Sequence, residues 1–126
     1  MRFGFLSGLF ARRGGYAALA ERFATTGPPS EPAFHGYSVM LDNTVAYKFC
    51  VTLAASAAGL YLHPQPRGLG ALPAVLIPWE QIGRVEKARL YWRPGVRLTI
   101  GEPRVASITL FADLWEQLAA RAAPLQ

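Results

Sequence analysis

Hydrophobic and polar residues alternate along most of the chain from residue 34 onwards. A period of two is typical of β-strands that bury one face, so this pattern predicts a β-rich domain. The alternation and the turn residues place the expected strands at residues 34–41, 47–53, 60–62, 74–77, 84–92, 96–100 and 105–110. The last three strands follow one another closely and are expected to form an antiparallel meander.

Turn residues separate these strands. Residues 42–43 and 101–103 are made of the Asp, Asn, Gly, Glu and Pro types found in turns. The Pro-Gly pair within residues 92–95 predicts a type II turn. A tight turn is also expected at residues 78–81, where the flanking isoleucines favour a position for Trp79 in the core.

The second expected strand has the largest apolar face. Its large apolar residues fall at every other position, and they are Tyr47, Phe49, Val51 and Leu53. The intervening residues are Lys48, Cys50 and Thr52. This alternation predicts a half-buried strand whose four apolar side chains all face the core.

Two helices are predicted outside the strands, because residues 16–24 and residues 112–122 repeat apolar side chains at helical spacing. The apolar stripe of the second helix consists of Leu114, Trp115, Leu118 and Ala122. We expect Trp115 to be buried in the core, where its neighbours would be Phe49, Val51 and Leu98. Residues 25–32 hold three prolines and a glycine, which predicts a linker without regular structure.

Seven short strands followed by an amphipathic helix predict a barrel or sandwich whose open end is covered by that helix. A plain antiparallel sheet packed on two helices is the alternative. The expected organisation is an N-terminal part at residues 1–32, formed by an apolar arm, a helix and the linker. A β domain with its C-terminal helix would follow at residues 33–123.

The arm at the N-terminus combines large apolar residues with two arginines. Its residues are Phe3, Phe5, Leu6, Leu9, Phe10, Arg12 and Arg13. Gly4, Ser7 and Gly8 interrupt the apolar run and arginines follow it directly, which argues against a cleaved signal peptide. Two alternatives remain: the arm docks on its own domain or on a second copy, or it lies on a membrane surface with its apolar side chains in the headgroup boundary.

The composition indicates the net charge of the protein and the kind of compartment that suits it. The 126 residues fit one domain, the formal charge is +5, and eleven of the thirteen basic residues are Arg. A single cysteine excludes an intrachain disulfide and suits a reducing compartment. No run of about 18 apolar residues is present. We therefore expect a cytoplasmic protein, with a peripheral position at the inner membrane surface as the alternative.

The residue types that carry catalysis or bind metals form no recognisable set. His35, His63 and the single Cys50 are too few for a structural zinc site. Ser56 lies among alanines, without the turn pattern of a catalytic nucleophile. Residues 68–70 lack the further Gly, Lys and Ser or Thr of a phosphate-binding loop. We therefore expect no enzymatic activity, no cofactor, no metal and no small-molecule substrate.

Basic residues near the meander are the best candidates for binding. They are Lys87, Arg89, Arg93 and Arg97, and the aromatic Tyr91 lies among them. One interpretation is a basic stripe that contacts phosphates while Tyr91 stacks or enters a headgroup region. The other is a solvated face whose long Arg stems cover the sheet. Nucleic acid is an unlikely partner, because no recognition motif accompanies the charge.

Three short motifs follow one another in the chain: GLYL at residues 59–62, LIPWEQI at 76–82 and GRVE at 83–86. Together they resemble small bacterial proteins with a pleckstrin-homology-like fold related to GRAM domains. The resemblance covers about residues 14–122 and implies a barrel or sandwich of about seven strands. The loop at 64–73 lacks the basic and aromatic character of a phosphoinositide clamp. The expected function is a non-enzymatic interaction module that binds a protein, including a second copy, with binding to anionic membrane as the alternative.

Overall fold

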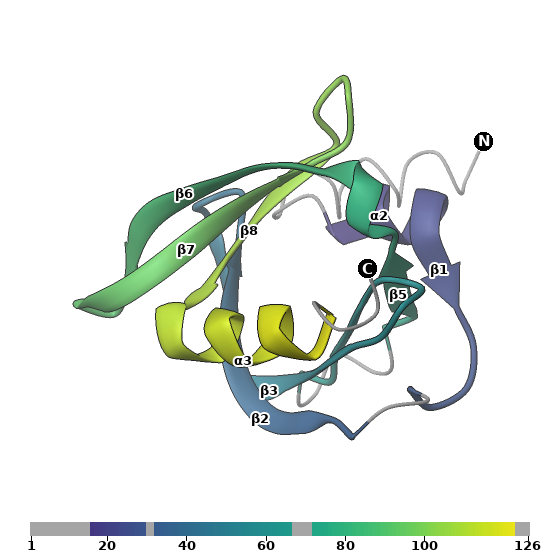
Figure 1. Ribbon diagram of the computed structural model, residues 1–126, viewed down its shortest axis with the longest axis horizontal. Helices are drawn as coiled ribbons and strands as arrows, with labels where there is room; N and C mark the ends of the chain where they lie inside the picture. The colour runs from purple at the N-terminus through teal and green to yellow at the C-terminus, as the bar shows by residue number, and fades with distance from the viewer. Residues whose placement is uncertain (1–15, 30–31, 67–71, 123–126) are drawn as a thin grey trace.

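The computed structural model describes residues 16–29, 32–66 and 72–122, and it is mainly β. Eight antiparallel strands form one open sheet in the order β1-β5-β4-β3-β2-β8-β7-β6 (Figure 1). The strands are β1 (Ala24–Thr25), β2 (Phe34–Leu41), β3 (Val45–Ala55), β4 (Leu60–Pro64), β5 (Ala74–Ile77), β6 (Ile82–Leu90), β7 (Arg93–Ile100) and β8 (Ala106–Phe111). Two helices, α2 (Tyr16–Phe23) and α3 (Ala112–Ala122), accompany the sheet.

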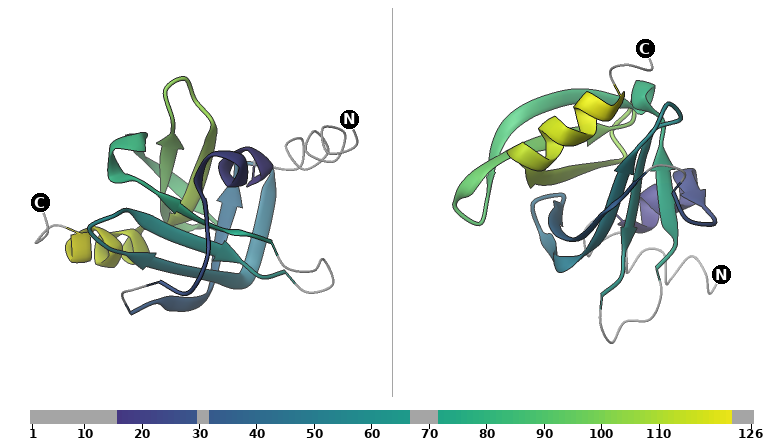
Figure 2. Two further views of the ribbon diagram at one scale, coloured as in Figure 1. Left: turned by 90° about the vertical axis from the view of Figure 1, so that its right-hand side faces the viewer. Right: turned by 60° about the horizontal axis from the view of Figure 1, so that its bottom comes forward.

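The sheet consists of two meanders that meet at β2. One runs from β2 to β5, and the other runs from β6 to β8. They are joined where β8 pairs with the end of β2, at Met40 with Thr109 and Leu41 with Ile108. The sheet curves strongly between the two meanders, so that α3 lies across the space it encloses (Figures 1 and 2). The predicted antiparallel meander of the last three strands is confirmed.

The core lies inside this curve and is closed by the helices. Alternate residues of the strands supply fully buried Leu, Ile and Val side chains. On α3, Leu114, Leu118 and Ala122 are buried, as the helical spacing predicts. On α2, Tyr16 and Leu19 join the same cluster of buried residues. The first helix therefore packs on the core that the strands build.

The predicted linker contains an additional short strand. Ala24 pairs with Val75 and Thr25 pairs with Ala74, so β1 extends the sheet beyond β5. The prediction of no regular structure from residue 25 is wrong at Thr25, because the exposed edge of β5 offers hydrogen bonds before the first proline. The Tyr61 hydroxyl then donates to the Gly27 carbonyl at 3.3 Å.

The turn between β5 and β6 holds two tryptophans together. The predicted tight turn is confirmed as a short 3-10 helix, η1 (Trp79–Gln81). The indole N–H of Trp79 donates to the Ser56 carbonyl at 2.7 Å, and its ring meets Trp115 edge to face at 6.4 Å between centroids. Trp115 is therefore half-buried at the margin of the core.

The predictions from the sequence are wrong for the position of Phe49 and for the turn before β7. Phe49 lies outside the core with 77% of its surface exposed, although it is expected among the core neighbours of Trp115. The turn predicted at residues 92–95 lies two positions earlier, at residues 90–93 with Tyr91 and Trp92 at its centre, and β7 already begins at Arg93. A residue that precedes proline is restricted to extended backbone, which places Arg93 in a strand and moves the turn upstream.

Candidate interaction surface

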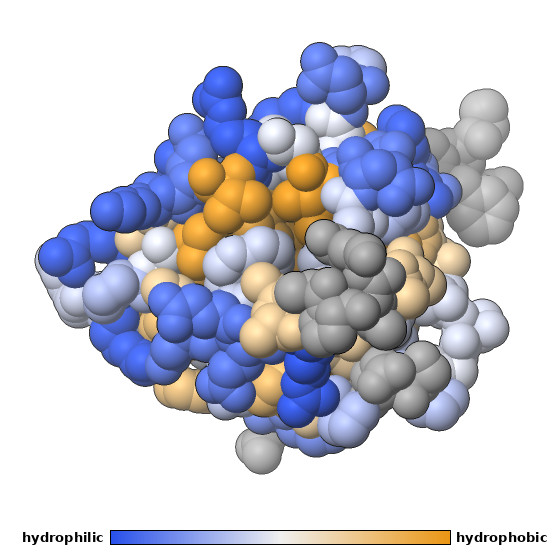
Figure 3. Space-filling view, viewed as in Figure 1, coloured by the Kyte–Doolittle hydropathy of each residue, from blue (hydrophilic) through white to orange (hydrophobic). Residues whose placement is uncertain are grey.

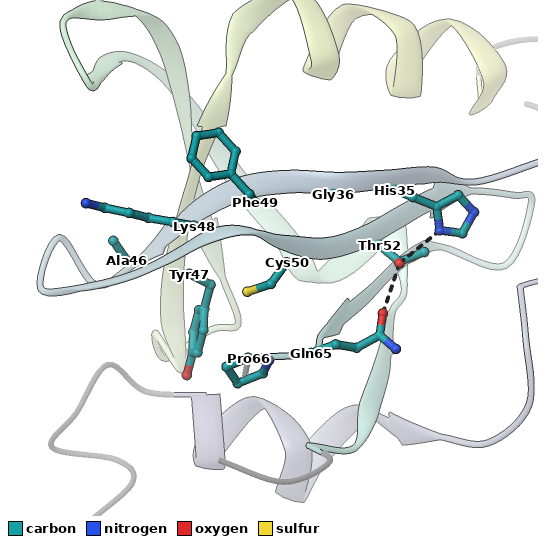
Figure 4. Close-up of a pocket in the computed structure, with 10 residues that line it drawn as sticks. All are labelled: His35, Gly36, Ala46, Tyr47, Lys48, Phe49, Cys50, Thr52, Gln65 and Pro66. Atoms are coloured by element: carbon teal, nitrogen blue, oxygen red, sulfur yellow. Dashed lines mark hydrogen bonds between the residues drawn. The ribbon is translucent and has the colours of Figure 1, made fainter. Parts of the chain in front are cut away.

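A β-bulge between β2 and β3 places Phe49 on the outside of the sheet. Tyr37 pairs with Val51 but Val39 pairs with Tyr47, so three residues of β3 stand opposite one residue of β2. Phe49 lies in the bulge with a φ of 56°, and its N–H donates to the Ser38 hydroxyl at 2.9 Å. A left-handed residue reverses the alternation. Phe49 therefore points towards the side of α3, whereas Tyr47 and Cys50 point towards the side of α2 (Figure 4).

The β6–β7 hairpin ends in two aromatic residues with left-handed backbone. Tyr91 has a φ of 51° and Trp92 has a φ of 69°, which are the values of a two-residue type I′ turn. Such turns normally hold Asn and Gly, because left-handed backbone is costly for residues with a Cβ. The Trp92 side chain is 91% exposed. The fold thus holds an almost fully solvated indole at the tip of the β6–β7 hairpin.

A lysine joins the bulge to the hairpin tip. The ammonium of Lys48, in the bulge, lies 5.5 Å from the centre of the Tyr91 ring. A cation at this distance is attracted to the negative face of the ring. Burial, and to a smaller extent the neighbouring Cys50, raises the pKa of Tyr91, so its phenol is neutral at physiological pH. Phe49, Lys48, Tyr91 and Trp92 are called the aromatic surface below.

Two of the predicted basic residues lie next to the aromatic surface and are already engaged. Arg89 donates from Nη1 to the Trp92 carbonyl at 2.9 Å, which closes the turn. The Arg93 guanidinium lies 4.1 Å from the centre of the Phe111 ring, and its Nη2 lies 3.6 Å from the Asp113 carboxylate. Both side chains are exposed beside the turn at the tip of the hairpin.

The other predicted basic residues lie on opposite faces of the hairpin. Arg97 stands opposite Glu86 in the register, and the two side chains form an ion pair at 3.5 Å on the outer face. Lys87 stands opposite the buried Val96 and therefore shares the face that looks towards the core. The structure thus does not unite the predicted residues in a single stripe: Arg97 is separated from Lys87 and Arg89.

A cleft of about 620 Å³ opens on the other side of the bulge (Figure 4). Its polar part is a chain of hydrogen bonds, in which the Thr52 hydroxyl lies 3.2 Å from His35 Nδ1 and donates to Gln65 Oε1 at 3.3 Å. Its other lining residues include Lys48, Phe49 and Cys50. Among the described residues no carboxylate lines the cleft, so none of them gives His35 an acidic partner there of the kind that orients a catalytic base.

The remaining predicted sites are limited by what the structure describes. The arm residues, from Phe3 to Arg13, lie outside the described residues. Among residues 16–29, 32–66 and 72–122, no group of three His, Cys, Asp or Glu side chains could hold a metal ion. Within the same ranges, no helix is long and apolar enough to cross a membrane.

Comparisons with known proteins do not identify a family for this chain. No family model, no curated protein and no solved structure matches this chain. The candidate site therefore rests on the geometry of the chain itself.

Hydrophobic periodicity does not predict three members of the aromatic surface. It places Phe49 in the core, Lys48 on a plain polar face, and Trp92 at the edge of a type II turn. One available signal was the Arg93-Pro94 pair, which requires extended backbone and so leaves the two preceding aromatics to make the turn. For the bulge no comparable signal exists, because the alternation of residues 47–53 is unbroken in the sequence.

Proposed function

We propose that this protein is a non-enzymatic interaction module that binds a partner protein through the aromatic surface. The observation that carries the proposal is Trp92, which is 91% exposed and held in a left-handed turn. An aromatic side chain in that position has neither burial nor backbone preference in its favour. Strained residues of this kind cluster at binding sites, where another molecule supplies the missing contacts.

The residue types of the aromatic surface favour protein as the partner. Trp, Tyr and Arg dominate the residues whose truncation weakens protein complexes most. Here Trp92 and Tyr91 stand beside Arg89 and Arg93, and Phe49 adds a third exposed ring. The hydrogen bond from Arg89 and the contact from Lys48 hold this group in place before binding. Preorganised side chains lose less conformational entropy when a partner docks.

The fold that we propose for the module is pleckstrin-homology-like. Supporting features are the two meanders, the curved sheet and the C-terminal helix that lies across the enclosed space. The short GLYL and LIPWEQI motifs fall on β4 and on the β5–η1 turn. We also propose a cytoplasmic location, supported by the single cysteine.

Co-purification from cells that express the protein tests the proposal. We expect Trp92→Ala to lose a partner that the unaltered chain retains, because truncation of a central indole removes the largest contact. Gln117→Ala is the matched control, since Gln117 is exposed on α3 and does not belong to the aromatic surface. Equal recovery of every partner by Trp92→Ala and by the unaltered protein would contradict the proposal.

Peripheral binding to anionic membrane is the second candidate. The observation in its favour is the exposed indole at a hairpin tip with Lys87, Arg89 and Arg93 behind it. Trp partitions into the membrane interface, and each nearby cation adds about 1 kcal/mol of attraction to anionic lipid at low salt. Sedimentation with anionic vesicles, with neutral vesicles as the control, separates the two candidates. Salt-sensitive binding to anionic vesicles that Trp92→Ala abolishes would favour the membrane.

Self-association through the arm is a further form of protein binding, which we propose from the apolar residues between Phe3 and Phe10. Light scattering of the full chain and of a chain that begins at Gly14 measures it. A larger mass for the full chain alone supports a dimer held by the arm. Equal monomer masses at high concentration would exclude this role.

A further inference from the structure

The outer edge of the sheet at β6 has unpaired backbone groups. Within the described parts of the chain β6 pairs only with β7, and it is the last strand in the order of the sheet. It spans nine residues, which is longer than the edges that proteins usually leave open. An open edge of this length can accept another extended chain as an additional strand.

The register of the hairpin shows which residues present their backbone outwards. Leu90 and Arg93 close a two-residue turn and therefore form a hydrogen-bonded pair. Pairs then alternate along the strands, so Val85, Lys87 and Arg89 occupy the positions that are not hydrogen-bonded to β7. Pro94, which lacks an N–H, stands opposite Arg89, as this assignment requires. The N–H and C=O groups of the three residues consequently point away from the sheet.

The side chains of the same three residues share one face. Val85 stands opposite Leu98 and Lys87 stands opposite Val96, and both of these partners are buried beside α3. Val85 is nevertheless 48% exposed, because the helix does not extend over β6. Figure 3 shows hydrophobic surface gathered on this side of the molecule next to the β6–β7 hairpin. An added strand would cover this apolar surface with alternate side chains.

The charged side chains of β6 favour an acidic segment as the added strand. Arg84, Lys87 and Arg89 are exposed on β6, while the acidic Glu86 lies within 3.6 Å of Arg84 and 3.5 Å of Arg97. A second copy of β6 would place like charges opposite one another, which destabilises strand pairing. An acidic chain would instead place its carboxylates opposite Lys87 and Arg89.

We infer that the β6 edge binds an acidic, extended segment of a partner protein as a ninth strand of the sheet. In antiparallel pairing, the segment runs past Arg89 first, then Lys87, then Val85. It should therefore carry an acidic residue opposite Arg89, a second acidic residue two positions later opposite Lys87, and an apolar residue two further positions along opposite Val85. The inference rests on the proposed protein-binding function and names a partner class for the hairpin that carries Trp92.

Amide hydrogen exchange tests the edge in the full-length protein alone. We expect the amides of Val85, Lys87 and Arg89 to exchange fast, and those of Glu86, Ala88 and Leu90 to be protected by β7. Slow exchange of the first set would mean that this chain or a second copy already occupies the edge. That result would overturn the inference.

A synthetic peptide tests the occupant. The probe has nine residues, with Glu at its third and fifth positions, Val at its seventh and Thr elsewhere, and the control peptide has Lys in place of both Glu residues. At saturation the Glu peptide should slow exchange at Val85, Lys87 and Arg89 by roughly tenfold, and the Lys peptide should not. Equal effects of the two peptides, or no protection by either, would overturn the inference.

Two substitutions at one position separate backbone pairing from charge. Lys87→Gln removes the cation and keeps the N–H, so binding should weaken roughly threefold and become less dependent on salt. Lys87→Pro also removes the outward N–H without breaking a bond to β7, and binding should weaken roughly tenfold more. Equal affinities of the two variants would refute strand addition. If the peptide shifts only Trp92 signals and Trp92→Ala abolishes binding, the inference fails while the proposed function stands.

Discussion

Replacing Trp92 by Gly should make the protein more stable while it removes the proposed binding surface. The Trp92 backbone has a φ of 69°, a conformation that costs an L-residue with a Cβ about 1–2 kcal/mol and costs Gly almost nothing. Loss of the side chain is nearly free in the isolated protein, because 91% of its surface is already in contact with water. The substitution therefore relieves strain without opening a cavity.

The size of the gain follows from two opposing effects. Relief of about 1–2 kcal/mol is reduced by about 0.5–1 kcal/mol, since Gly loses more backbone entropy on folding. The net stabilisation is then between about 0 and 1.5 kcal/mol, which corresponds to a rise in melting temperature of up to roughly 6 °C for a domain of this size. Trp92→Ala is the matched control, because Ala keeps the Cβ and thus most of the strain.

Thermal unfolding followed by circular dichroism measures both variants. We expect a higher midpoint for Trp92→Gly, a midpoint within about 2 °C of the unaltered protein for Trp92→Ala, and loss of the partner in both. A lower midpoint for Trp92→Gly would refute the reasoning, because it would mean that the indole packs on the protein and stabilises the turn.

Three further predictions concern the scaffold and are measured by urea or thermal unfolding. Gly59→Ala should lower the free energy of unfolding by roughly 3 kcal/mol or more, because a Cβ there would lie 2.2 Å from the Ile77 carbonyl oxygen. An unchanged unfolding midpoint would contradict this close approach of the two backbone segments. Leu118→Ala should lower the free energy of unfolding by about 2–5 kcal/mol and Trp115→Ala by about 2 kcal/mol, since only Leu118 is fully buried. A larger loss for Trp115→Ala would mean that α3 turns Trp115, and not Leu118, into the core. Burial raises the pKa of Tyr16, so this phenol should lower folding stability above pH 10 by up to about 1.4 kcal/mol per pH unit as it ionises in the unfolded chain. Tyr16→Phe should make the loss of stability with pH shallower, although it leaves the Pro73 carbonyl without its donor, and an equal slope in both proteins would contradict the burial.

The strands and helices could be predicted because burial follows a regular period in most of them. The alternation in β7, with Val96, Leu98 and Ile100 inside, continues without a break, so the core face is read correctly. The same holds for α3, where Leu114 and Leu118 fall on one stripe. At these positions one local pattern and the tertiary packing agree.

The candidate site could not be predicted because it depends on interruptions of that period. The β-bulge turns Phe49 outwards through a single left-handed residue, although its neighbours continue the alternation. The aromatic turn at Tyr91 and Trp92 contradicts the usual preference for Asn and Gly. The contact between Lys48 and Tyr91 joins residues far apart in the chain. Local periodicity contains no information about any of these three features.

Site-specific photo-crosslinking in living cells tests the central claim most directly. A photoreactive phenylalanine analogue would replace Trp92 in one variant, Phe49 in a second, and the exposed Gln117 of α3 in a control. The proposal predicts that positions 92 and 49 capture the same discrete protein and that position 117 does not. Capture of lipid alone at position 92, or identical products from all three positions, would contradict a protein-binding aromatic surface.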